Sequence, residues 1–199
     1  MMNDSQTFSF DAGALCLDFA NTCGDRPLCS EEKLGTVKDL VDWGAAAGLV
    51  STEETDRFLA TGGGDEAVRE AVALREAIYS VCSSLARGGV PHRRDLAMIN
   101  STLRAALPNL ELGVRGSGCC WRWSDASTAS DRIIWPVARS AADLLTSDTV
   151  ELLRECAGEG CSWLFLDRSR NHRRKWCSMS SCGNRAKARR HYARTRSKR

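Results

Sequence analysis

The sequence predicts a mainly α-helical protein with a small β-hairpin and, at its C-terminus, a treble-clef-like module (α+β) in which four cysteines hold zinc. Three observations predict this fold. Apolar residues recur at helical spacing through most of residues 1–150. Two alternating segments flank a glycine-containing turn, as in a hairpin. Two C-x4-C pairs, fifteen residues apart, lie in residues 151–199.

Charge divides the chain at the same place. The 199 residues suit one domain, or one domain with a small appendage. Residues 168–199 hold thirteen of the 28 Lys and Arg residues and none of the 25 acids, which leaves 15 basic against 25 acidic residues elsewhere. A basic tail on an acidic body calls for a polyanionic partner or a solvated state.

Nothing in the sequence indicates export or a membrane. The N-terminal residues lack the basic and apolar regions of a signal peptide, and no uncharged apolar run approaches the ~20 residues that span a bilayer. We therefore expect a cytoplasmic, nucleoid-associated protein. Its ten cysteines should stay reduced there, as metal ligands or buried small side chains and not as a disulfide framework.

The N-terminal region predicts an extended segment at Phe8–Phe10 and a helix over 14–22. Asp18 and Asn21 are polar residues inside this apolar helix. They either hydrogen-bond neighbouring backbone or line, with Trp43 of the next helix, a small-molecule pocket.

Four further helices follow before the hairpin. The first covers 36–48, with Gly48 as its stop, and the second begins at the capping box Ser51–Glu54. Residues 61–64 are a glycine-rich turn. Apolar residues spaced by three and four predict the longest helix over 65–86, with Arg75 at the edge of the stripe. The fourth helix, 92–107, lies between two prolines.

The hairpin joins residues 110–115 to 119–124, with Trp121 and Trp123 on one face. A helix over 133–145 places Pro136 in its first turn. Asp148, with Glu151 three residues on, predicts a last body helix that runs into Cys156. The zinc module would then grow directly from a helix.

The four cysteines of the C-x4-C pairs form the predicted metal site. Four thiolates bind one Zn²⁺ tetrahedrally and leave no open position, so the metal should be structural. Residues 163–167 and 171–176 read as the two strands of a hairpin between the pairs. The predicted ligands are Cys156, Cys161, Cys177 and Cys182.

The cations of the tail predict a nucleic-acid interface. Residues 184–196 have the composition of a helix that is basic on all sides and offers only Ala186, Tyr192 and Ala193 for packing. Two or three cations near the cysteines would instead offset the −2 charge of the zinc site. A solubilising tail or a protein-docking patch is the alternative. The predicted contacts are Arg168, Arg170, Arg173, Arg174, Lys175, Arg185, Lys187, Arg189, Arg190, Arg194 and Arg196.

Two segments resemble a known architecture. The Cys182-Gly-Asn-Arg185 motif, with residues 163–171 before it and 186–191 after it, closely resembles the CGNR zinc finger. Residues 15–22, the Trp-containing helix and the Trp hairpin are similar to its companion, the ABATE domain. The resemblance implies a bacterial, stress-associated transcription regulator with a helical N-terminal domain, and it implies the same four zinc ligands.

The leading hypothesis is a DNA-binding regulator whose body senses a small-molecule effector or forms a homodimer. An RNA- or ribosome-associated protein is the first alternative. The second is an enzyme with a nucleic-acid-targeting tail, although no catalytic constellation is recognisable. The remaining cysteines should mostly be buried small side chains, and a redox switch at Cys119 or Cys120 is an alternative for those two adjacent residues; the set is Cys16, Cys23, Cys29, Cys82, Cys119 and Cys120.

Overall fold

The computed structural model describes residues 8–26, 28–60, 64–124 and 128–196. The glycine-rich turn predicted at 61–64 falls almost entirely outside these residues. The α-helices are α1 Leu15–Ala20, α2 Val37–Ala46, α3 Thr52–Ala60, α4 Asp65–Ala86, α5 Arg93–Ala106, α6 Ala129–Leu145 and α7 Asn184–Arg196. The strands are β1 Cys23–Gly24, β2 Glu31–Glu32, β3 Leu110–Arg115, β4 Gly118–Trp123, β5 Leu153–Glu155 and β6 Leu164–Leu166, each pair antiparallel.

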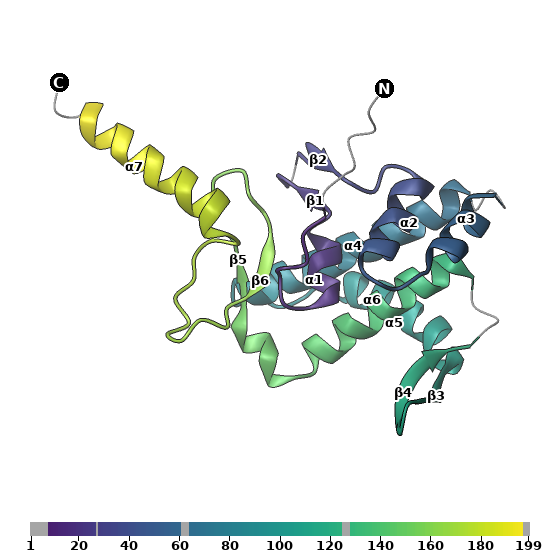
Figure 1. The fold of residues 1–199 in the computed structure, drawn as a ribbon. Coiled ribbons are helices and arrows are strands. Elements are labelled where there is room, and N and C mark those ends of the chain that lie inside the picture. Colours follow the sequence, from purple (N-terminus) through teal and green to yellow (C-terminus); the bar gives the residue numbers. More distant parts are fainter. Residues whose placement is uncertain (1–7, 27, 61–63, 125–127, 197–199) are drawn as a thin grey trace.

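Helix α4 is the centre of the body. It packs against α1, α2, α5 and α6, and its predicted stripe is buried, including Leu74, Ile78 and Val81. The ribbon shows the helices gathered around it, the β3–β4 hairpin projecting from one end and α7 from the other (Figure 1). The predicted mainly helical fold is therefore confirmed.

Local signals place most helix ends. Thr36 and Asp39 form a capping box at the start of α2, Ser51 and Glu54 form one at α3, and Gly48 takes φ +71° after α2. Helix α6, however, begins at Ala129 and not at residue 133. A capping box between Thr128 and Asp131 starts it a turn earlier, so Pro136 lies in its interior.

The predicted hairpin forms, but its turn is one residue shorter than expected: Gly118 already belongs to β4 and pairs with Arg115, so that Leu112 lies opposite Trp121. Trp123, at its base, packs on Trp135 of α6 with ring centroids 5.6 Å apart. Toward the tip Leu112, Val114 and Trp121 are exposed. The hairpin is therefore anchored at its base by Trp123 and midway by Trp121, whose ring centroid lies 4.8 Å from the Arg139 guanidinium carbon of α6.

The prediction of a helix from Asp148 to Cys156 is wrong. A 3₁₀ turn covers Asp148–Leu152, and the chain then extends as β5, which pairs with β6. The extended form places Leu153 in the main core and turns Glu155 toward α4.

The second strand predicted in the zinc module, 171–176, is also absent among the described residues. The buried carboxylate of Asp167 accepts hydrogen bonds from the backbone N–H of Ser169 (3.0 Å) and of Arg174 (2.8 Å). His172 takes φ +49°. These contacts fold the segment into a compact loop, and β6 pairs with β5 instead.

Strand β6 joins the body to the zinc module. Alternate residues of a strand face opposite sides. Leu164 and Leu166 enter the main core, whereas Phe165 packs with Cys156, Cys177 and Cys182. The hydrophobic packing therefore continues across residues 150–151, where the two domains were predicted to meet.

Cys23 and Cys29 form a disulfide, which corrects the expectation that every cysteine is a reduced thiol or a metal ligand. The turn between β1 and β2 brings the two residues together, with Cα atoms 5.8 Å apart. Cys16 and Cys82 are buried, as expected of small apolar side chains. Cys119 and Cys120 are free thiols at neighbouring positions of β4, but Cys119 is exposed and Cys120 half-buried, so neither is the buried small side chain that was expected.

Candidate zinc centre and nucleic-acid interface

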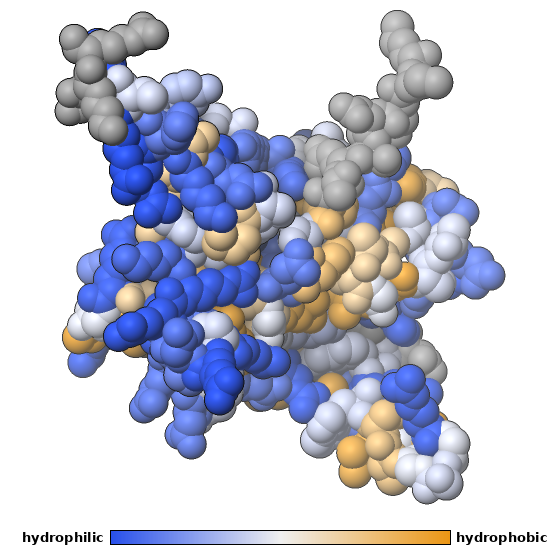
Figure 2. Space-filling model, turned by 60° about the vertical axis from the view of Figure 1, so that its left-hand side comes forward, coloured by the Kyte–Doolittle hydropathy of each residue, from blue (hydrophilic) through white to orange (hydrophobic). Residues whose placement is uncertain are grey.

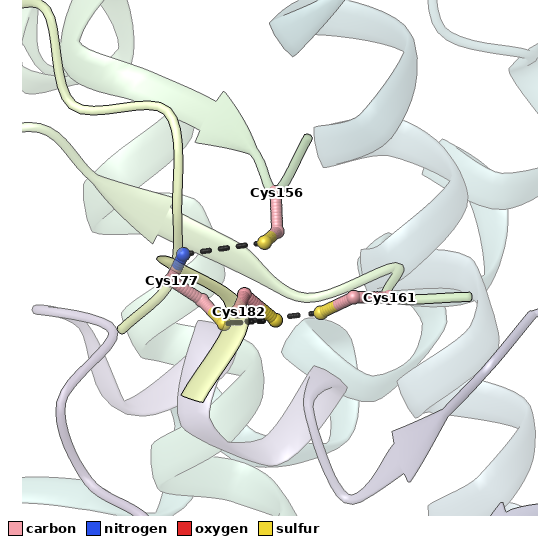
Figure 3. A group of neighbouring side chains, drawn as sticks. All are labelled: Cys156, Cys161, Cys177 and Cys182. Atoms are coloured by element: carbon pink, nitrogen blue, oxygen red, sulfur yellow. Dashed lines mark hydrogen bonds between the residues drawn. The ribbon is translucent and has the colours of Figure 1, made fainter. Parts of the chain in front are cut away.

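The four predicted ligands converge. Their Sγ atoms lie within 4.8 Å of one another, with 3.8 Å between Cys161 and Cys177 and 3.7 Å between Cys177 and Cys182. Figure 3 shows the four side chains pointing at one another. A tetrahedral ion with zinc–sulfur bonds of about 2.3 Å has sulfur–sulfur edges of about 3.8 Å. The cluster therefore has the dimensions of a four-thiolate zinc site.

Two short turns deliver the ligands in pairs. Cys156 follows β5, and the turn to Cys161 closes through a hydrogen bond from the Cys161 N–H to the Gly158 carbonyl (3.0 Å). Cys177 precedes a π-helical turn, Met179–Gly183, and Cys182 lies within that turn, which leads into α7. The ligand geometry thus fixes the direction in which α7 leaves the module.

Two glycines leave room for this geometry. A Cβ on Gly158 would lie 3.0 Å from the Cys182 Sγ and 3.2 Å from the Cys161 Cβ. A Cβ on Gly183 would lie 2.8 Å from the Met179 Sδ. The approach to the ligand cysteines therefore favours glycine at position 158, whereas at position 183 the flexible end of Met179 could move aside.

The electrostatics of the cluster call for a cation. Hydrogen bonds from Cys161 and Cys177 lower the pKa of Cys156, whose Sγ also accepts from the backbone N–H of Cys177 (3.3 Å) and Gly158 (3.4 Å). Donating to Cys156 raises the pKa of Cys161 to about 12. Four adjacent thiols cannot all ionise on their own. A divalent ion that prefers thiolates removes this conflict.

The residues fit one structural zinc ion. Four cysteines saturate a tetrahedral ion, and three of the four, Cys156, Cys177 and Cys182, are buried. When bound, the metal would cross-link two turns that share only a small apolar cluster. His172, which was not expected to bind zinc, is engaged elsewhere, with its Nδ1 2.9 Å from the Asp167 carbonyl oxygen.

Some of the predicted basic residues hold the module together. Arg185 donates to the Cys182 Sγ at 3.1 Å, which offsets charge on that ligand. Arg174 lies over the Phe165 ring, 4.4 Å from its centroid, and donates to the Cys177 carbonyl. Arg168 reaches the carbonyl of Gly13 at 3.4 Å, and Arg189 pairs with Glu159.

The remaining basic residues face solvent. Arg170, Arg173 and Lys175 are exposed beside the zinc cluster. Helix α7 continues the cationic surface with Lys187, Arg190, Arg194 and Arg196, all exposed. Figure 2 shows this end of the molecule in the blue of hydrophilic residues.

Helix α7 has the predicted bounds but does not pack as the composition suggested. No residue of it is buried, and Tyr192 is 73% exposed. It leaves the module as a separate rod (Figure 1). Its first turns contact the module through Arg185, half-buried Ala186 and Arg189, whereas residues 190–196 are exposed on all sides and available to a partner.

The polar residues of α1 bind backbone. Asp18 accepts from the Ala12 N–H (2.9 Å). Asn21 donates to the Leu164 carbonyl and accepts from the Leu164 N–H, both at 2.9 Å. The space that Asp18 and Asn21 share with Trp43 is too small for a water molecule. The buried Trp43 Nε1, however, has no hydrogen-bond partner among the described residues.

The ionic network around Arg75 was not predicted from the sequence. This fully buried side chain of α4 binds Glu32 through two nitrogens (2.5 and 2.7 Å) and Glu76 at 2.8 Å. Glu76 also accepts from Arg26, whose guanidinium lies 3.9 Å from the centroid of the Tyr79 ring. The one available signal was an arginine at the edge of an apolar stripe.

A second polar contact links α4 to the zinc ligands. Glu155, one residue before Cys156, accepts from Arg87 (2.7 and 2.8 Å) and from Ser83 (2.9 Å). With Asn21, these contacts tie both ends of the first cysteine turn to the body.

Comparisons with known proteins agree with this architecture. The sequence model of the ABATE family, described as "Putative stress-induced transcription regulator", matches residues 13–148. That of the CGNR zinc finger matches residues 153–195. No curated protein matches the chain. Within the described residues, no helix has the length and apolar character needed to cross a membrane.

Proposed function

The chain belongs to the ABATE family and carries a CGNR zinc finger, and we propose that it is a zinc-dependent transcription regulator that binds DNA through its zinc module and α7. One observation carries the proposal. Helix α7 is basic along its length and has no buried residue. Such a helix gains little from folding against protein, whereas phosphates would neutralise its charge.

The zinc module would orient this helix. Cys182 lies in the π-helical turn that runs into α7, and Arg185 in its first turn contacts the same sulfur. Bound metal would therefore hold the first turn of α7 at a fixed angle to the loop that carries Arg170, Arg173 and Lys175. Those cations and the helix would then contact one polyanion together.

Salt dependence of binding tests the proposal. If about 6 phosphates are contacted, log K for duplex DNA should fall against log salt with a slope of about −5 in a fluorescence-anisotropy titration. Replacing Lys187, Arg190 and Arg194 by Gln should reduce that slope by about 3. The matched control changes three body arginines, Arg57, Arg69 and Arg104, to Gln. A slope near zero for the unaltered protein would refute nucleic-acid binding.

An experiment in cells distinguishes DNA binding from RNA binding. Crosslinking and sequencing should enrich discrete promoter sites if the protein is a nucleoid-associated regulator, and the enrichment should be lost in Cys177→Ser. Enrichment of transcripts or ribosomal RNA would favour the RNA-associated alternative. The family descriptions name a regulator and a zinc finger, not an enzyme.

We propose further that a small polar effector acts at Asp18, Asn21 and Trp43. The unpartnered Trp43 Nε1 supports a polar ligand, and Asn21 would pass a displacement to β6 through Leu164. The local space would have to widen first. Metabolites that raise the melting temperature of the protein, but not that of Trp43→Phe, would support the site. A ligand that stabilises both proteins equally would place it elsewhere.

A homodimer is the last part of the proposal, because a single zinc module reads only a short stretch of DNA. Light scattering should give twice the monomer mass on DNA. A monomer both free and on DNA would exclude it.

A further inference from the structure

We propose that Cys23–Cys29 is a reversible thiol–disulfide site, opened and closed by low-molecular-weight thiols, and that its state sets how firmly the first cysteine turn of the zinc module is held on the body. The inference does not depend on DNA binding. It rests on the accessibility of the two sulfurs, the backbone of the loop that they close and the contacts of that loop.

The two sulfurs differ in access. Cys23 is fully buried, whereas Cys29 is partly exposed. Thiol exchange depends on access to the sulfur that is attacked. The buried Cys16 and Cys82 cannot compete, because burial raises the pKa of Cys16 to about 12 and also raises that of Cys82. An external thiol would therefore react at Cys29, with Cys23 as the leaving sulfur.

The loop is held in an unfavourable conformation. Asp25 and Cys29 have φ of +52° and +49°, a left-handed region that disfavours residues other than glycine, although less so for aspartate. Within the loop the Arg26 side chain is buried, at 8% exposed, whereas Leu28 is 78% exposed and gains little from the fold. Opening the crosslink would let both residues relax to ordinary backbone angles.

The same loop touches the zinc module. The Arg26 N–H donates to the Oγ of buried Ser162, the residue after Cys161, at 3.1 Å. The Asp25 Oδ1 lies 3.5 Å from the position of a Cβ on Gly160. On the body side the Arg26 guanidinium donates to the carbonyls of Cys23 (2.6 Å) and Ala20 (2.8 Å). The loop therefore connects α1 to the first cysteine turn of the zinc module.

The exchange balances with a thiol of the glutathione type. Its thiolate attacks the Cys29 sulfur, the sulfur–sulfur bond breaks, and Cys23 leaves as a thiolate that takes up a proton. A second thiol then attacks the mixed disulfide and releases Cys29 as a thiol, together with the oxidised small disulfide. Two electrons pass from the two small thiols to the protein, and the reverse sequence closes the bond.

Hydrogen exchange of the zinc-loaded protein tests the proposal. The unaltered protein is equilibrated in oxidised or reduced glutathione, and zinc content is measured in each sample. We expect the amides of residues 157–163 to exchange about tenfold faster in the reduced protein, while those of α5 do not change. Cys23→Ser/Cys29→Ser should exchange like the reduced protein in both buffers. Cys119→Ser/Cys120→Ser, the matched control, should keep the response.

Three results would overturn the inference. Equal exchange of residues 157–163 in both buffers would show that the state of the disulfide does not affect how firmly the cysteine turn is held. A disulfide that persists in reduced glutathione would be a fixed crosslink. A second zinc ion in the reduced protein would make Cys23, Cys29 and Glu32, whose ligand atoms lie within 4.8 Å of one another, a metal site. The main comparison uses the unaltered protein in two buffers, so the test remains valid even if the double variant does not fold.

Discussion

At the scale of single residues, Arg75 organises the polar side of α4. Its buried guanidinium meets carboxylates from β2 and from its own helix. Removing one partner of a buried pair is strongly destabilising, because the other partner keeps its charge without compensation. Glu32 and Glu76, however, are partly exposed and could be rehydrated.

Arg75→Met should therefore lower the free energy of unfolding by about 3 kcal/mol, the lower end for a broken buried pair. Urea denaturation measures this. Arg69→Met in the same helix removes an exposed pair with Glu66 and should cost less than about 0.5 kcal/mol. Equal costs for the two variants would contradict the network's role.

Asp18 makes stability depend on pH. Burial raises its pKa from 3.8 to about 6, against the opposing hydrogen bond from Ala12. The folded state holds this proton more tightly than the unfolded state, so the stabilisation is complete below pH 3.8 and is lost as pH rises through about 6. Asp18→Asn keeps an oxygen for the Ala12 N–H and removes the titration.

The difference in unfolding free energy between Asp18→Asn and the unaltered protein should therefore grow in favour of the variant from pH 4 to pH 7. Denaturation at several pH values gives this difference and cancels titrations that both proteins share. A difference that is independent of pH would show that Asp18 titrates normally.

At the scale of elements, α1 and β6 are joined by one side chain. Both backbone groups of Leu164 bind Asn21, which lies 143 residues away in the sequence. Asn21→Ala leaves a buried N–H and a buried carbonyl unpaired and should cost about 3 kcal/mol. Thermal or urea unfolding checks this. Asn100→Ala, on the exposed face of α5, should change stability by less than about 0.5 kcal/mol.

The same elements show what the sequence could predict. Apolar periodicity predicted α4 and α5, composition predicted the bounds of α7, and the cysteine spacing predicted the metal cluster. The capping residues at Asp148 do start a helical turn, but it is a single 3₁₀ turn. The chain then becomes a strand, because Leu153 pairs with Leu166. Such a three-residue strand has no periodicity to detect.

Contacts between distant parts of the chain could not be predicted either, because no local sequence pattern marks them. Nothing in the spacing of Cys23 and Cys29 separates a disulfide from two free thiols. Asp18 and Asn21 were recognisable as polar residues in an apolar helix, but their partners, Ala12 and Leu164, follow only from the tertiary fold. Local sequence thus predicted which residues matter better than it predicted what they contact.

At the scale of the whole molecule, two apolar clusters of unequal size predict how metal loss acts. The main core draws on all body helices and on β5 and β6, whereas the zinc cluster is built around Phe165 and three cysteines. Removing zinc with a chelator should release residues 169–196 while the body stays folded.

Circular dichroism at 222 nm should then fall only by the share of α7, which has 13 residues. The fluorescence of Trp176, beside Gly183, should change at the same time. Cys177→Ser should resemble the chelated protein without any chelator. Loss of most of the helical signal would mean instead that the metal is needed to fold the body.

The alternation of β6 makes this zinc finger a poor candidate for transfer to another protein. A zinc finger that folds alone buries its apolar residues within itself, but here Leu164 and Leu166 are buried against helices of the body. A fragment cut at residue 150 would expose these leucines and tend to aggregate, and the remaining body would have a gap where they had packed. A host protein that received the module would therefore have to cover this leucine face with apolar surface of its own.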